Sequence, residues 1–121
     1  MAEEQWQSIR EQLRRRRERH IADLEAEAPR LAQAAAEMGA QRVVLFGSAA
    51  RGNAGLSSDL DLLVVWDTPL DFLERTVEAY RRLQPRVALD LLVYTPAEME
   101  RLAGRPFIQR ALEEGKVLYE S

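Results

Sequence analysis

Two carboxylates, spaced two positions apart, are the residues of this chain whose types first suggest chemistry. Asp59 and Asp61 begin the run 59–65, DLDLLVV, whose leucines and valines predict a short strand. Side chains alternate between the faces of a strand, so both carboxylates should project from one face. Like charges that close repel each other unless a cation lies between them, and a divalent metal would resolve the conflict. The alternative is that Asp59 caps the start of the strand and Asp61 is solvated, as in most isolated Asp-x-Asp patterns.

A turn suited to phosphate precedes this pair. The apolar run 43–46, VVLF, predicts a buried strand that ends at Gly47. Gly47 and Ser48 then open the segment 49–51, which could form one helical turn whose free N–H groups point back at the strand end. We therefore expect an anion site here, followed by a flexible, polar loop through Ser58.

A third carboxylate interrupts a later apolar run. Residues 86–94, RVALDLLVY, predict another strand in which Asp90 is the exception. An unpaired carboxylate is costly to bury, so Asp90 must reach solvent, a cation or a metal. A metal would place it beside Asp59 and Asp61 on a neighbouring strand, whereas the alternative is a carboxylate at a strand edge paired with an arginine.

These residues, taken in order, carry a family resemblance. Gly47-Ser48, then Asp59-Leu60-Asp61, then Leu89-Asp90-Leu91 resemble the signature of the DNA polymerase β-like nucleotidyltransferase superfamily. The phrase LFGSAARG…SDLDLLV resembles more narrowly the minimal nucleotidyltransferases (MNT proteins), including the MntA-type antitoxins of HEPN/MNT toxin–antitoxin pairs. The likeness spans about residues 30–119 by element order.

The resemblance implies an activity and roles for the site residues. It implies transfer of AMP from ATP to a protein hydroxyl, commonly a tyrosine of a partner HEPN toxin. Two Mg²⁺ ions would be held by Asp59, Asp61 and Asp90, with Asp90 on the second ion and on the proton of the incoming hydroxyl. Gly47 and Ser48 would bind the β- and γ-phosphates. Arg51 is also expected to bind nucleotide, whereas Ala49 stands where many members have a bulky or basic residue.

Composition limits the other possibilities. The 121 residues predict one domain, and 17 basic against 20 acidic residues give a net charge of −3, which argues against general nucleic-acid binding. The absence of cysteine excludes disulfides and thiolate metal sites, and the single histidine excludes a histidine-rich one. No membrane-length apolar run or signal-peptide pattern is present, so we expect a cytoplasmic protein without a membrane partner.

The N-terminal part predicts helix. We divide the chain into a helical extension, 1–28, and a catalytic core, 29–121, with helical pieces over 3–27 and 29–38 separated at Pro29. Trp6 lies on an apolar stripe and is a candidate for burial against a partner. The arginine-rich run 14–19 is either an RNA or partner contact or a solvated face, and His20 is expected to be structural or on the surface.

The remaining elements complete an α+β fold. Helical spacing covers 72–83, Thr95 and Glu98 form a capping box before a helix to Leu102, and a further helix over 107–112 precedes a short strand at 116–119. We expect a small mixed sheet with helices packed mainly on one face. Short helices and a closing strand would leave no segment after Asp90 to contact an acceptor.

Three functions remain open. The first is an adenylylating antitoxin that uses Mg²⁺ and ATP; the second is a non-catalytic antitoxin that only binds its partner. The third is a small-molecule nucleotidyltransferase of the aminoglycoside type, which needs a second wall for its substrate. Three converging acids favour an enzyme, and the short chain disfavours the third function unless it forms a homo- or hetero-oligomer.

Overall fold

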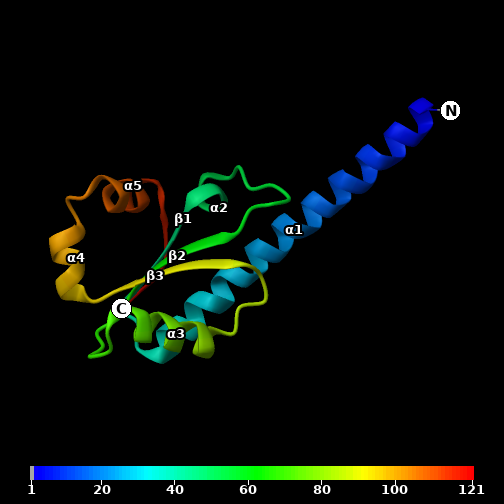
Figure 1. Ribbon diagram of the computed structural model, residues 1–121. Helices are drawn as coiled ribbons and strands as arrows, with labels where there is room; N and C mark the ends of the chain where they lie inside the picture. The colour runs from blue at the N-terminus through cyan, green and yellow to red at the C-terminus, as the bar shows by residue number, and fades with distance from the viewer. Residues whose placement is uncertain (1) are drawn as a thin grey trace.

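A four-stranded mixed sheet forms the centre of the protein (Figure 1). The computed structural model describes residues 2–121. The strands lie in the order β3-β2-β1-β4, with β1 antiparallel to β2 and β4 and with β2 parallel to β3. Their bounds are Arg42–Phe46 (β1), Leu60–Val65 (β2), Leu89–Tyr94 (β3) and Lys116–Glu120 (β4). This arrangement confirms the predicted mixed sheet.

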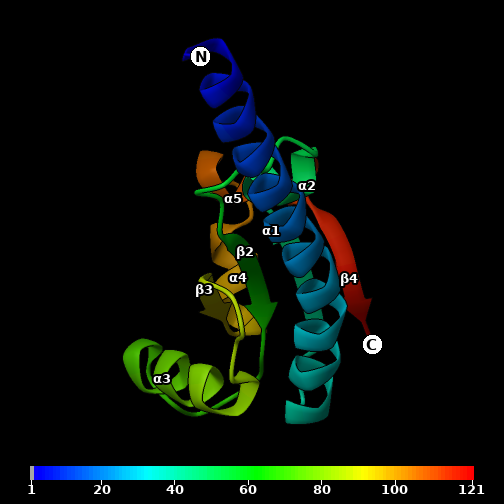
Figure 2. The same cartoon turned by 90° about the vertical axis from the view of Figure 1, so that its right-hand side faces the viewer.

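Helices cover both faces of this sheet, whereas we expected them mainly on one face (Figure 2). The larger core joins one face to α1 and α3, and a smaller cluster joins the opposite face to α4 and α5. The parallel pair β2 and β3 is connected by α3, as predicted for a crossover helix. The helices are α1 (Ala2–Met38), α2 (Gly47–Arg51), α3 (Phe72–Leu83), α4 (Pro96–Leu102) and α5 (Pro106–Glu114).

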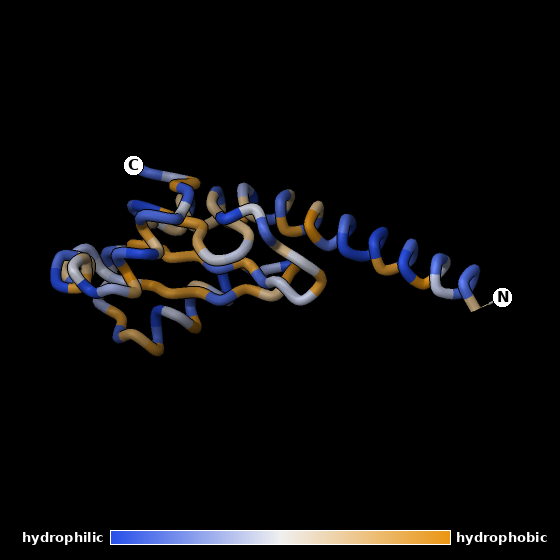
Figure 3. Tube along the Cα trace, turned by 90° about the horizontal axis from the view of Figure 1, so that it is seen from above, coloured by the Kyte–Doolittle hydropathy of each residue, from blue (hydrophilic) through white to orange (hydrophobic). Residues whose placement is uncertain are grey.

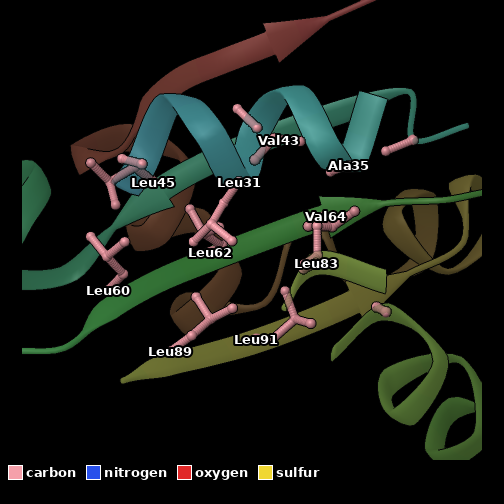
Figure 4. Close-up of a cluster of buried hydrophobic side chains, with 14 of the residues drawn as sticks. Leu31, Ala35, Val43, Leu45, Leu60, Leu62, Val64, Leu83, Leu89 and Leu91 are labelled. Carbon is pink, nitrogen blue, oxygen red and sulfur yellow. The ribbon is translucent and has the colours of Figure 1, made fainter. Parts of the chain in front are cut away.

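Strand alternation decides which side chains enter the larger core (Figure 4). Even-numbered residues of β2 and odd-numbered residues of β3 face α1 and α3, and full burial of each leucine contributes roughly 1.5–3 kcal/mol. The buried strand residues on this face are Val43, Leu45, Leu60, Leu62, Val64, Leu89, Leu91 and Val93. Asp61 and Asp90 therefore project from the other face, toward α5.

The predicted break at Pro29 is wrong, because α1 is one helix from Ala2 to Met38 with Pro29 inside it. Proline has no N–H, so the carbonyl of Glu25 loses its helical donor, at a cost of about 3 kcal/mol. Leu24, Ala28, Leu31 and Ala35 form one buried stripe across that position. Their packing against the sheet outweighs the cost and keeps the helix continuous.

The predicted strand at 86–94 is also too long, since β3 begins at Leu89. The backbone N–H of Arg86 donates to the buried carboxylate of Glu27 on α1 and is not part of a strand ladder. Arg30 binds the same carboxylate, with Nε 2.5 Å from Oε1, and donates to the carbonyl of Gln84 at 2.9 Å. This polar cluster fixes the turn that leads into β3.

The first half of α1 projects away from the sheet (Figures 1 and 3). Side chains of residues 2–19 are exposed apart from the half-buried Glu11. Trp6 is 59%, Ile9 45% and Leu13 41% exposed, so the apolar stripe has no cover within residues 2–121. No helix in this described part of the chain is long and apolar enough to cross a membrane.

A buried arginine joins α3 to the end of β3 and to α4. Arg75 is 3% exposed; its Nη2 lies 2.6 Å from Glu98 Oε1, and its Nε donates to the carbonyl of Val93 at 3.1 Å. The capping box predicted at Thr95 and Glu98 is confirmed, so Glu98 both caps α4 and holds Arg75.

We predict that Arg75→Met lowers the free energy of unfolding by about 2–3 kcal/mol, because the carbonyl of Val93 and the carboxylate of Glu98 lose their donor. Urea unfolding measures this loss. Arg81→Met on the same helix is the matched control, since the Arg81 side chain is 69% exposed and should change stability by less than about 0.5 kcal/mol. Equal effects of the two substitutions would contradict the structural role of Arg75.

Candidate active site

Two of the predicted acids face each other across neighbouring strands. Asp61 of β2 and Asp90 of β3 are partners in the parallel register, and both project from the α5 face of the sheet. Asp61 is half-buried, whereas Asp90 is exposed. Their carboxylates are within hydrogen-bonding reach of each other, so the register places Asp90 beside Asp61, as we expected if Asp90 served a metal site.

The proximity of Asp90 and the burial of Asp61 change the pKa of Asp61. The pKa of Asp61 is raised from 3.8 to about 6, chiefly by burial and next by the hydrogen bond and negative charge of Asp90. The charge of Asp59 adds to this effect, and the guanidinium of Arg51 opposes it. Asp61 thus retains a proton more readily than an isolated aspartate, as expected of a half-buried carboxylate that faces other acids.

The turn after β1 lies directly against this pair. Gly47 has φ +73°, and a Cβ at this position would lie 2.1 Å from Oδ2 of Asp61. Only glycine fits both the left-handed conformation and the close approach of the carboxylate. Gly47 begins α2, as predicted, and Phe46 at its N-cap provides no side-chain hydrogen bond to the first turn. The N–H groups of that turn therefore have no side-chain cap.

Ser48 and Asp59 are connected to the loop between α2 and β2. The hydroxyl of Ser48 donates to the hydroxyl of Ser58 at 3.1 Å, and the backbone N–H of Gly55 donates to the same Ser58 oxygen at 2.8 Å. Asp59 is half-buried and lies one residue before β2, not inside the strand as predicted. Its position is therefore set by the loop.

Arg51 lies at the rim of the site. Its Nη1 is 3.5 Å from Oε2 of Glu114 on α5, and the two side chains are 46% and 43% exposed. Such an exposed pair contributes at most about 1 kcal/mol, so Arg51 can exchange this partner for an anion at little cost. Glu114 was not predicted as a site residue.

A cavity of about 390 Å³ brings together four of the predicted site residues, Gly47, Arg51, Asp61 and Asp90, whereas Ser48 and Asp59 are not among its lining residues. We expected no segment after Asp90 to be left to contact an acceptor, but α5, which follows Asp90, forms one wall of this cavity. Phe107 packs edge-on against Phe46, with ring centroids 6.0 Å apart. The lining residues are Phe46, Gly47, Arg51, Asp61, Asp90, Leu92, Phe107, Arg110, Ala111 and Glu114. Phe107, Arg110 and Glu114 recur at helical spacing on one face of α5, but that spacing alone does not indicate that this face lines a cavity.

A metal site is only partly assembled. Among residues 2–121, no three His, Cys, Asp or Glu side chains are already gathered in a geometry that could hold a metal ion. The oxygen-only donor set and the repulsion at Asp61 nevertheless fit a hard divalent cation, which such carboxylates bind. Asp61 and Asp90 would supply ligands as they stand, and Asp59 would have to complete the set.

Comparisons with known proteins agree with this geometry. The family described as "Nucleotidyltransferase domain" matches residues 28–119. A candidate protein adenylyltransferase of Methanocaldococcus jannaschii is 31% identical over 81 residues, which cover 65% of this chain and 78% of the relative.

A solved structure shares the fold. A candidate nucleotidyltransferase from Sulfolobus solfataricus superposes with a TM-score of 0.60 at 20% identity and covers 83% of each chain. A toxin–antitoxin crystal structure with AMP-PNP contains a chain with 26% identity and a TM-score of 0.46, covering 68% of this chain and 62% of the other. The chain belongs to the nucleotidyltransferase domain family, which confirms the resemblance to the minimal nucleotidyltransferases drawn from its motifs.

Proposed function

We propose that this chain is a metal-dependent enzyme that transfers AMP from ATP to a protein hydroxyl, a tyrosine of a HEPN-type toxin, and so acts as its antitoxin. The observation that carries the proposal is the convergence of Asp61 and Asp90 beside the Gly47 turn in one cavity. The name of the Methanocaldococcus jannaschii relative, a candidate protein adenylyltransferase, supports the class of acceptor. The HEPN partner and the tyrosine rest on the motif resemblance.

Asp59, Asp61 and Asp90 would hold the metal, with two Mg²⁺ ions expected. When bound, Mg²⁺ would neutralise negative charge on the triphosphate and on the attacking and leaving oxygens. Asp61 gains most from a cation, since its carboxylate is half-buried and faces Asp90. Asp90 is exposed to the cavity and can orient the proton of an incoming hydroxyl from there.

The α2 turn would hold the phosphates. The uncapped N–H groups at Gly47 and Ser48 are donors for phosphate oxygens, and the macrodipole of even a short helix favours an anion at that end. Arg51 would add a positive charge at the rim after leaving Glu114. The hydroxyl oxygen would then attack the α-phosphorus, its proton passing toward Asp90, while the bond to pyrophosphate breaks and pyrophosphate leaves.

One observation favours the small-molecule alternative. Phe107 and Arg110 of α5 give the cavity a wall that could contact an acceptor without a second protein. The exposed stripe at Trp6, Ile9 and Leu13 instead favours a protein partner, because nothing within residues 2–121 covers it. Incubation with labelled ATP and either the protein encoded by the neighbouring gene or an aminoglycoside distinguishes the two acceptors.

Replacing Asp61 by asparagine should stabilise the metal-free protein. The folded pKa of about 6 lies above the ordinary 3.8, so the native state binds the extra proton and ionisation of Asp61 costs stability as pH rises through 6. Asp61→Asn should therefore raise the free energy of unfolding at pH 7.5 by about 1 kcal/mol, after allowance for solvent screening, and by almost nothing below pH 4.

Urea unfolding in EDTA between pH 4 and pH 8 measures that difference. Calorimetry with Mn²⁺ should show that Asp61→Asn loses the metal site, whereas the exposed control Asp67→Asn keeps both the wild-type stability profile and the metal. A stability difference that does not vary with pH, or equal Mn²⁺ binding by Asp61→Asn and wild type, would contradict the assignment.

Asp90→Asn should retain the fold and some ATP binding but reduce transfer by at least about 100-fold, because the site loses both a metal ligand and the group that orients the hydroxyl. Transfer of label from ATP to the partner protein measures this. Glu113→Gln, an exposed change on α5 that does not line the cavity, is the control. Transfer at the wild-type rate by Asp90→Asn would make Asp90 structural.

Removal of residues 1–13 should weaken partner binding without unfolding the domain. Buried residues of α1 begin at Leu24, so the truncated protein should keep its free energy of unfolding within about 0.5 kcal/mol and still bind ATP and metal. Leu13→Ser tests the stripe in the full chain, and Val77→Ser on the exposed face of α3 is its matched control. Unfolding of the truncated domain would show that the stripe serves the domain's own packing.

A further inference from the structure

The loop over residues 52–59 has little packing: of its hydrophobic side chains, only Ala54 packs against the larger core. None of these eight residues is buried, and Leu56 is 44% exposed. On the α1 side the loop borders a second cavity of about 410 Å³, which is lined by Gly52 and Ala54 of the loop and by Ile21 and Leu24 of α1. This cavity occupies the position where a buried side chain would normally anchor such a loop. Polar contacts therefore add to this limited packing in fixing the position of the loop.

Those polar contacts converge on Ser58. Its N–H donates to the carbonyl of Gly55 at 3.1 Å, and its hydroxyl accepts from the Gly55 N–H at 2.8 Å and from Ser48 at 3.1 Å. These bonds tie the loop to itself and to α2. His20 links the loop to α1, because its Nε2 lies 2.7 Å from the carbonyl oxygen of Ser58. A carbonyl only accepts, so Nε2 must carry the proton in this bond.

The bonded carbonyl has a direct geometric connection to Asp59. The carbonyl of Ser58 and the N and Cα of Asp59 belong to one planar peptide group. A hydrogen bond that fixes this oxygen therefore also restricts the position of the Asp59 Cα, from which the carboxylate extends. That matters because residues 2–121 contain no ready-made three-ligand cluster, and Asp59 is the acid that would have to complete it.

We propose that His20 is a positioning residue that holds the peptide group before Asp59 and thereby sets the metal affinity of the acidic site. The link to metal rests on the proposed function, whereas the link between His20 and the loop does not. His20 was expected to be structural or on the surface, and its contact lies 38 residues away in the chain, so no local pattern indicates it.

Two measurements on the full-length protein test the two links separately. Hydrogen–deuterium exchange of the amides of residues 53–59, without metal, reports whether His20 holds the loop. Calorimetric titration with Mn²⁺ reports whether that hold matters for the acids. His20→Ala should speed exchange in the loop and weaken Mn²⁺ binding about 10-fold, the lower end of what loss of a ligand-orienting partner costs.

A pair of amide substitutions separates the hydrogen bond from side-chain volume. The amide nitrogen of His20→Gln can occupy the place of Nε2 and should restore most of the affinity and protection, whereas the shorter His20→Asn should not. Arg16→Ala, an exposed change one turn earlier on α1, should match wild type in both measurements. The Gln and Asn comparison remains decisive even if His20→Ala fails to fold.

The outcomes are distinguishable. Wild-type exchange in His20→Ala, or faster exchange with unchanged Mn²⁺ affinity, would overturn the proposal, as would equal behaviour of His20→Gln and His20→Asn. A wild-type protein that binds no Mn²⁺ would overturn the metal-dependent function and the metal part of this inference. In that case the exchange data would still decide whether His20 holds the loop.

Discussion

The repulsion between two carboxylates is the constraint around which this protein is built. The parallel register of β2 and β3 places Asp61 opposite Asp90, and the turn at Gly47 brings its backbone against the carboxylate of Asp61. Two like charges remain this close only if the strands beneath them cannot separate. The larger core on the opposite face of the sheet supplies that resistance, since Leu60, Leu62, Leu89 and Leu91, the residues flanking the two acids, are all buried in it. One alternating pattern thus forms the core and positions the acids.

The sequence predicted the elements that depend on local signals. Short apolar runs located the strands, and the Thr95 and Glu98 box located the start of α4. Pro29 misled the interpretation of α1, because the packing of Leu24, Ala28 and Leu31 across the proline is a tertiary effect that propensity does not include. β2 and β3 begin later than predicted, also because of contacts outside the local sequence. Asp59 lies one residue before β2, and the backbone N–H of Arg86 donates a hydrogen bond to Glu27 of α1 instead of to a neighbouring strand.

The site residues also divide into those with a local sequence signal and those placed by tertiary contacts. Gly47, Asp61 and Asp90 could be predicted because their types are unusual where they occur, a glycine at a strand end and acids within apolar runs. Phe107 and Arg110 look like ordinary residues of an amphipathic helix, and only the return of α5 over the sheet places them in the cavity. His20 is harder still, since its partner is a backbone carbonyl and backbone carries no sequence signal. Residues that act through shape or through backbone contacts are those that the sequence did not reveal.

The raised pKa of Asp61 and the left-handed backbone of Gly47 argue against a protein that only binds its partner. Asp61 is half-buried with its pKa raised to about 6, and Gly47 adopts a left-handed conformation with a carboxylate where a Cβ would be. Strongly perturbed groups of this kind cluster at functional sites, where a ligand or cation repays the cost. A binding surface on the exposed half of α1 would need none of them, because the stripe at Trp6, Ile9 and Leu13 lies on a part of the helix that projects from the domain. The acids and the stripe are therefore separate features, and the acids are explained by chemistry on a phosphate.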